Sequence, residues 1–145
     1  MADTLHRTTR AEREAFLRGV HIAIVSVDDP GHPPQSSPIW YLVTTEGNVE
    51  LHVAPDSRKL QLIKAAGAFT LCVQSEQRPP AYVTVQGPVI GYRPRDLEAD
   101  ARPLCHRYLG KEAGDQLLAS AMEGDEAVVI TMKPERWYGL DYGKS

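Results

Sequence analysis

The stretch Gln35–Val53, QSSPIWYLVTTEGNVELHV, contains two strand patterns separated by a tight turn. Residues 35–44 are rich in aromatic and β-branched side chains, residues 45–48 (TEGN) are typical of a hairpin turn, and residues 49–53 alternate apolar and polar. A hairpin joins antiparallel strands, whereas parallel neighbours need a crossover of roughly a dozen residues or more. The stretch therefore predicts an antiparallel sheet.

Similar patterns occur on both sides of this hairpin. Further strands are predicted over residues 21–27, 68–75, 81–92 and 127–132, and residues 135–142 extend the sheet. The strand over residues 81–92 should bulge or bend at Gly87–Pro88. Helices are predicted after a capping box of Thr9 and Glu12, over residues 57–67, and over residues 95–110 and 111–122, with a break or restart at Pro103. Together these elements predict one α+β domain over residues 1–145, an antiparallel barrel of six or seven strands with peripheral helices.

The composition argues against several classes of protein. The net charge of the 145 residues is −3, which does not suit a nucleic-acid-binding surface. Apolar runs such as Ile22–Val25 are far too short to span a membrane, and the first residues lack the apolar core of an export signal. Cys72 and Cys105 have no close spacing, so we expect a protein of the reducing cytoplasm.

The sequence contains no recognisable catalytic constellation of its own. The histidines are scattered, and the neighbours Cys105 and His106 point about 100° apart on a helix, so no metal site is expected. Walker loops, dinucleotide fingerprints and serine-hydrolase elbows are absent from the sequence. An enzyme built from this chain would need a cofactor to carry the chemistry, with the protein supplying position and electrostatics.

The sequence APDSRKLQLIKAAG (residues 54–67) combines a helix start with two basic residues. Asp56 or Ser57 is a good N-cap and Gly67 is a helix stop, so Arg58 and Lys59 fall in the first turn. There they add positive charge to the positive end of the helix dipole. One interpretation is an anion site for a phosphate or carboxylate. The other is a pair of solvated side chains, with Asp56 offsetting part of their charge.

Five motifs, in this order, resemble those of a known family of proteins. They are GHPPQSSPIWYLV (31–43), SRKLQLIKAAGAFTL (57–71), YVTVQGPV (82–89), RYLG (107–110) and PERWYGLDYGK (134–144). From about residue 20 to residue 142, the chain resembles the pyridoxamine 5′-phosphate oxidase-like split β-barrel proteins, which bind FMN or coenzyme F420. Within them it is most similar to the F420-dependent (deazaflavin) oxidoreductases of the B type. The resemblance implies a split barrel and a homodimer with the cofactor at its interface.

The resemblance also implies which residues contact the cofactor. The phosphate-binding SRK of the family falls on Ser57, Arg58 and Lys59, which favours the anion-site interpretation. The other positions implied to contact the cofactor are Ser37, Pro38, Ile39, Trp40, His52, Val53, Tyr82 and Trp137. Ser37 and Leu42 stand where the oxidases carry an arginine and a lysine, so a pyridoxamine phosphate oxidase is not expected and F420 is favoured over FMN.

Two classes of function remain open. The favoured one is an oxidoreductase that moves a hydride between bound F420, or alternatively FMN, and a conjugated small organic substrate, with Tyr41 or Tyr138 as a proton donor. The other is a flavin- or heme-binding module without turnover. The sequence leaves open the substrate and the direction of hydride transfer.

Overall fold

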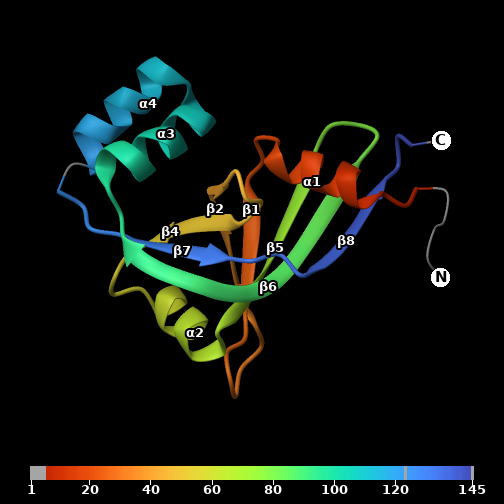
Figure 1. Cartoon of the computed structure of the whole chain (residues 1–145), viewed down its shortest axis with the longest axis horizontal. Coiled ribbons are helices and arrows are strands. Elements are labelled where there is room, and N and C mark those ends of the chain that lie inside the picture. Colours follow the sequence, from red (N-terminus) through yellow and green to blue (C-terminus); the bar gives the residue numbers. More distant parts are fainter. Residues whose placement is uncertain (1–5, 123, 145) are drawn as a thin grey trace.

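The computed structural model of this chain describes residues 6–122 and 124–144 (Figure 1). The strands are β1 (Ala23–Val27), β2 (Gln35–Ile39), β3 (Tyr41–Val43), β4 (Val49–Val53), β5 (Ala68–Ser75), β6 (Ala81–Pro94), β7 (Val128–Met132) and β8 (Arg136–Asp141). The helices are α1 (Arg10–Arg18), α2 (Arg58–Ala66), α3 (Arg102–Leu109) and α4 (Lys111–Leu117), with π-helical turns η1 (Leu97–Ala101) before α3 and η2 (Leu118–Met122) after α4.

The strands form one curled antiparallel sheet in the order β2-β1-β5-β6-β7-β4-β3, with β8 also paired to β6. The long strand β6 pairs with β5 and β8 along its first part and with β7 along its second part. Figure 1 shows β6 curving along the lower side of the barrel. The two ends of the strand order, β2 and β3, are consecutive in the chain and are separated by Trp40 alone. This arrangement confirms the predicted α+β split β-barrel.

The strand predicted over residues 35–44 is two strands in the structure. β2 pairs with β1 whereas β3 pairs with β4, so the chain changes its pairing partner at Trp40. The described residues therefore form eight strands instead of the six or seven predicted. A pattern of apolar residues identifies an extended segment, but it does not show where that segment leaves one neighbour for another.

β6 bends close to the predicted position. A Cβ atom at Gly87 would lie 1.8 Å from the carbonyl oxygen of Lys133, so only glycine lets these two segments approach so closely. The pairing register with β7 then shifts between Val89 and Gly91. The predicted bulge is confirmed, a few residues beyond the position that Gly87–Pro88 indicated.

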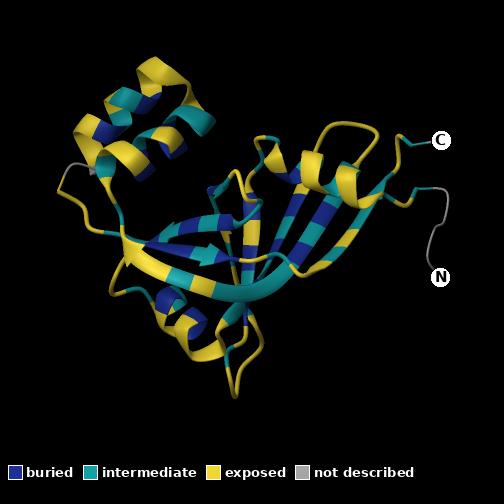
Figure 2. Cartoon of the chain, in the orientation of Figure 1, coloured by how far each residue is buried: buried dark blue, intermediate teal, exposed yellow. Residues whose placement is uncertain are grey.

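Alternation along the strands places one face of the sheet in the core. Val25, Leu51, Leu71, Val83 and Ile130 are at most 1% exposed, and Figure 2 shows buried positions alternating with more accessible ones along the strands. We call β2, β1, β5, β8 and residues 81–88 of β6 half-sheet 1. We call β7, β4, β3 and residues 89–94 of β6 half-sheet 2.

The helices begin and end largely where their capping residues predict. Thr9 and Glu12 form both hydrogen bonds of the capping box of α1, at 3.2 and 3.0 Å. Ser57 caps α2, and Gly67 ends it with a left-handed φ of 71°. Pro103 lies in the first turn of α3, directly after the π-helical turn η1 gives way to the α-helix, so the predicted break or restart is confirmed. Within the described residues, each helix is too short or too polar to cross a membrane.

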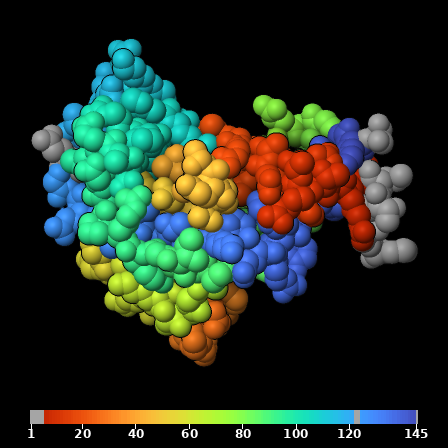
Figure 3. Space-filling model, in the orientation of Figure 1, coloured from red at the N-terminus to blue at the C-terminus, as the bar shows by residue number. Residues whose placement is uncertain are grey.

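The helices α3 and α4 project from the barrel as a separate pair (Figure 3). The end of α3 is held by Tyr108, whose hydroxyl donates to the carbonyl oxygen of His21 at 2.7 Å and whose ring stacks on Trp40 with centroids 4.6 Å apart. The neighbouring Arg107 donates to the carbonyl oxygen of Gly19 at 2.6 Å. These contacts attach α3 to the segment that joins α1 to β1.

Candidate functional site

The residues expected to contact a cofactor lie on different faces of the barrel. Ser37 and Trp137 occupy inward-facing positions of β2 and β8, opposite buried valines of the neighbouring strands, and Ile39 packs against the core. Pro38 and Tyr82 occupy outward-facing positions of β2 and β6. One copy of the chain thus does not bring all of these residues to a single place.

The first turn of α2 carries two basic side chains in different surroundings. The guanidinium of Arg58 lies 2.9 Å from the carboxylate of Asp29 in the loop after β1, not beside Asp56 as one interpretation assumed. Lys59 is half-buried, burial lowers its pKa, and no described carboxylate forms an ion pair with it. The hydroxyl of Ser57 accepts the N–H of Leu60 at 3.2 Å, so this oxygen is occupied as the helix cap.

His52 is a half-buried side chain with unsatisfied hydrogen-bonding capacity. Both ring nitrogens are shielded from solvent and lack a hydrogen-bond partner among the described residues. Burial lowers the pKa of His52 to about 4, the nearby charge of Arg95 adds to this effect, and Asp100 opposes it. The imidazole is therefore neutral at pH 7, with one N–H donor and one nitrogen acceptor to offer. It is not part of a metal cluster, since the described residues contain no group of three or more metal-ligating side chains.

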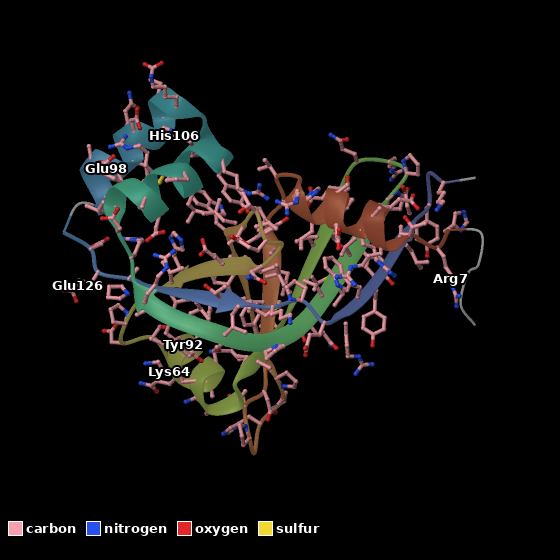
Figure 4. The ribbon with its side chains drawn as sticks, in the orientation of Figure 1. Arg7, Lys64, Tyr92, Glu98, His106 and Glu126 are labelled. Carbon is pink, nitrogen blue, oxygen red and sulfur yellow. The ribbon has the colours of Figure 1, made fainter. Side chains whose placement is uncertain are left out.

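A groove of about 770 Å³ runs from His52 to residues 54–56, the segment directly before the cap of α2. Its lining consists of His52, Val53, residues 54–56, Arg95 and residues 124–127. Ser57 follows Asp56 directly, so the groove ends beside the cap of α2. Asp56, Asp125 and Glu126, the last labelled in Figure 4, make part of the rim acidic. Of the residues expected to contact a cofactor, the groove is lined by His52 and Val53 and stops directly before the SRK segment. Ser37, Tyr82 and Trp137 do not line it.

The aromatic residues around Trp40 are committed to packing within the chain. The hydroxyl of Tyr41 is buried and donates to the carbonyl oxygen of Leu17 at 2.6 Å, and burial raises the pKa of Tyr41. Trp40 is stacked on Tyr108. Tyr138 is different, because it is 44% exposed and its hydroxyl lies 2.6 Å from the guanidinium of Arg136. Of the two tyrosines expected as proton donors, only Tyr138 is open to solvent.

Arg95 lines the groove, but no pattern in the sequence marks it as a site residue. It follows β6 directly, its guanidinium donates to the carbonyl oxygen of Asp125 at 2.9 Å, and its Nε is buried without a partner among the described residues. A basic residue between a strand and a helix is ordinary in a sequence. Only the folding of residues 124–127 against β6 reveals its place beside His52.

The similarity of this chain to known proteins lies in its three-dimensional structure. No family model matches the sequence, and no curated protein matches it. Among solved structures, a conserved hypothetical protein from Mycobacterium tuberculosis has a TM-score of 0.74 at 15% identity, over 97% of this chain and 89% of that one. An F420 reductase has a TM-score of 0.68 at 21% identity, over 86% of this chain and 94% of that one. An FAD-binding protein from Mesorhizobium loti has a TM-score of 0.63 at 15% identity, over 94% of this chain and 97% of that one.

The chain adopts the pyridoxamine 5′-phosphate oxidase-like split-barrel fold. This confirms the fold that the five sequence motifs implied. Since the identities are below a quarter, the likeness concerns the fold, and the cofactor and the reaction have to be argued from the residues of this chain.

Proposed function

We propose that this chain is an F420-dependent oxidoreductase that transfers a hydride between bound deazaflavin and a conjugated small organic substrate. The observation that carries the proposal is the groove at His52, whose lining runs to Asp56, directly before the cap of α2. The first turn of that helix carries Lys59, a half-buried lysine without a carboxylate partner among the described residues. The structural likeness to an F420 reductase supports the same assignment.

The first turn of α2 would hold the anionic part of the cofactor. The N–H groups at a helix start point toward an anion, and the helix dipole favours negative charge there. Without an anion, Arg58 and Lys59 each oppose that dipole by about 0.3–1 kcal/mol. When an anion is bound there, each charge-assisted hydrogen bond to it contributes about 1.5–3 kcal/mol to the binding free energy. Arg58 is exposed and can exchange Asp29 for a ligand, because a surface ion pair contributes about 1 kcal/mol or less.

The segment from Ser37 to Trp40 and His52 would border the ring system. Ser37 and His52 both carry buried polar atoms without partners among the described residues, and such atoms are the groups that a ligand with donors and acceptors satisfies. When bound, F420 or FMN supplies the hydride chemistry. The chain positions the cofactor, and the exposed hydroxyl of Tyr138 can deliver a proton to the substrate.

A homodimer with the cofactor at its interface would explain why the expected contact residues lie on several faces. The outer face of half-sheet 1 exposes apolar side chains that a soluble monomer rarely gathers. Ile24 of β1 is 40% exposed and lies opposite the partly exposed Cys72 of β5. Val20 and Ile22, in the segment directly before β1, are 57% and 53% exposed and add to the apolar surface. Pro38, Tyr82 and Tyr138 lie on this face too. A second copy packed here would therefore place outward-facing and groove residues of two chains around each cofactor.

Titration of the purified protein with F420 and with FMN, followed by cofactor fluorescence, tests this proposal. We expect F420 to bind more tightly than FMN, and reduced F420 to be consumed on addition of an enone such as 2-cyclohexenone. Tighter binding of FMN, or protein that is yellow as isolated, would favour the FMN-dependent alternative. Cofactor binding without turnover of any conjugated probe would favour a carrier module, and a Soret band with hemin in place of flavin binding would favour a heme-binding one.

A further inference from the structure

We propose that a second pocket, between α1, the β3–β4 hairpin and the start of β8, binds a small aromatic carboxylate. The pocket has a volume of about 300 Å³, at the small end of the range for ligand sites. It shares no lining residue with the groove at His52. The inference does not use the groove, although the family resemblance also implies a cofactor contact at Trp137, which lines this second pocket.

One residue of the pocket carries a hydrogen-bond donor that no described residue uses. Trp137 lines the pocket, and the indole Nε1 is buried without an acceptor among the described residues. A buried N–H without an acceptor is unfavourable, because it has lost its hydrogen bond to water without gaining another. A ligand oxygen that accepts this N–H would remove that cost, so the site favours a ligand with an acceptor on an otherwise apolar body.

The floor of the pocket suits the apolar part of such a ligand. Leu17 is 1% exposed, Val43 packs against the core, and both line the pocket together with Trp137. The guanidinium of Arg10 lies 5.0 Å from the centre of the Trp137 ring. A flat ring is the shape that contacts indole and guanidinium surfaces together, which favours an aromatic body over a branched aliphatic one.

The charges of the lining favour an anion. Arg10 and Glu14 lie 2.7 Å apart and offset one another. Of the remaining charged residues in the lining, Arg18 and Lys133 are basic and Glu46 is acidic. Arg18 donates to the carbonyl oxygen of Thr44 at 3.1 Å, whereas Lys133 is exposed and has no ion pair among the described residues. Lys133 is therefore the cation that a ligand carboxylate can recruit without breaking a contact of the fold.

Nuclear magnetic resonance of the cofactor-free protein, with benzoate as the probe and neutral benzamide as its isostere, tests the proposal. The chain has two indole N–H signals, and a Trp40→Phe variant assigns them. We expect benzoate to shift the signal of Trp137 and to leave that of Trp40 in place. Benzamide should bind several-fold more weakly, because it lacks the charge.

Lys133→Gln should weaken benzoate binding several-fold, whereas Lys111→Gln, an exposed lysine on α4, should leave it unchanged. Both positions are on the surface, so neither variant threatens the fold. An unmoved Trp137 signal would overturn the proposal. Equal binding of benzoate and benzamide, or full benzoate affinity in Lys133→Gln, would overturn it too, since the anion would then not be recognised. Because F420 is absent throughout, failure here would not bear on the groove at His52.

Discussion

The guanidinium of Arg58 lies 2.9 Å from the carboxylate of Asp29, so the first turn of α2 is tied to the loop that leaves β1. Lys59, the next residue, has no ion pair among the described residues, and burial lowers its pKa. The two basic residues of the SRK segment therefore differ. Arg58 contributes to the fold through one exposed ion pair. Lys59 instead carries its positive charge where partial burial and the helix dipole both disfavour it.

Replacing Lys59 by glutamine should weaken F420 binding about tenfold or more, because one charge-assisted contact to the cofactor is lost. The melting temperature of the cofactor-free protein should stay unchanged or rise slightly, because a cation is removed from the positive end of the helix dipole. Fluorescence titration and thermal unfolding measure the two effects. Lys64→Gln is the matched control, since Lys64 lies in the last turn of the same helix and 5.4 Å from the ring of Tyr92, as labelled in Figure 4. Lys64→Gln should leave the affinity for F420 unchanged and lower the melting temperature slightly. Unchanged affinity in Lys59→Gln would remove the anion site from α2.

The stability of the protein should fall as the pH is lowered from about 6.5 to about 4, in part because of His52. Its pKa is lowered from 6.5 to about 4 by burial, so the unfolded chain takes up this proton at a higher pH than the folded chain does. Protonation in that range therefore favours unfolding, by about 2–3 kcal/mol for this one group. Denaturant unfolding at pH 7 and pH 4.5 should show a smaller loss in His52→Gln than in the wild type. His32→Gln, in the exposed turn after β1, should lose as much as the wild type. Equal losses in all three proteins would mean that His52 is solvated in solution.

An acidic residue on the outer face of half-sheet 1 should separate the proposed homodimer. Ile24→Asp would place a charge within this apolar surface, where an unpaired buried charge costs several kcal/mol. Sedimentation of the wild type should give about twice the chain mass of 16.0 kDa, and that of the variant the single mass. Ile90→Asp, at a position of β6 that is 55% exposed, is the control and should remain dimeric. A wild type that sediments as a monomer and still binds one cofactor per chain would contradict the interface.

The two candidate tyrosines should respond differently to loss of the hydroxyl. Tyr41→Phe should lower the free energy of unfolding by about 1–2 kcal/mol, because the hydrogen bond to Leu17 disappears from a buried site. Its turnover rate with a conjugated probe should be little changed. Tyr138→Phe should leave stability nearly unchanged and reduce turnover, if this exposed hydroxyl delivers the proton. Thermal unfolding and steady-state rates on both variants separate packing from proton transfer. A reduced rate in Tyr41→Phe alone would reverse the assignment.

Local features of the sequence predicted local features of the structure well. The caps at Thr9 and Gly67 were predicted, and that of α2 was narrowed to Asp56 or Ser57, because each cap depends on residues within one helical turn. The bend of β6 was predicted because glycine followed by proline within a strand disfavours regular pairing. Each of these signals is complete within a few residues of the chain.

Relationships across the fold were not predicted. The partner of Arg58 is Asp29, 29 positions away in the sequence, and nothing local distinguishes it from Asp56. The change of partner at Trp40 depends on where β1 and β4 lie, and the neighbourhood of His52 and Arg95 depends on the return of β7 alongside β6 and β4. The motifs of the family identified the fold. They could not show that the expected contact residues occupy several faces of one chain.

The position of β7 in the barrel has a consequence for how this chain folds as it is synthesised. β7 is the strand that pairs with both β6 and β4, and it lies at residues 128–132, late in the chain. Until it emerges from the ribosome, β6 and β4 each present an unpaired backbone edge, and the apolar interior remains open. Unpaired edges of this kind attract other nascent chains. The barrel can therefore close only after β7 has been synthesised, and the helices between β6 and β7 lengthen the time for which those edges stay open.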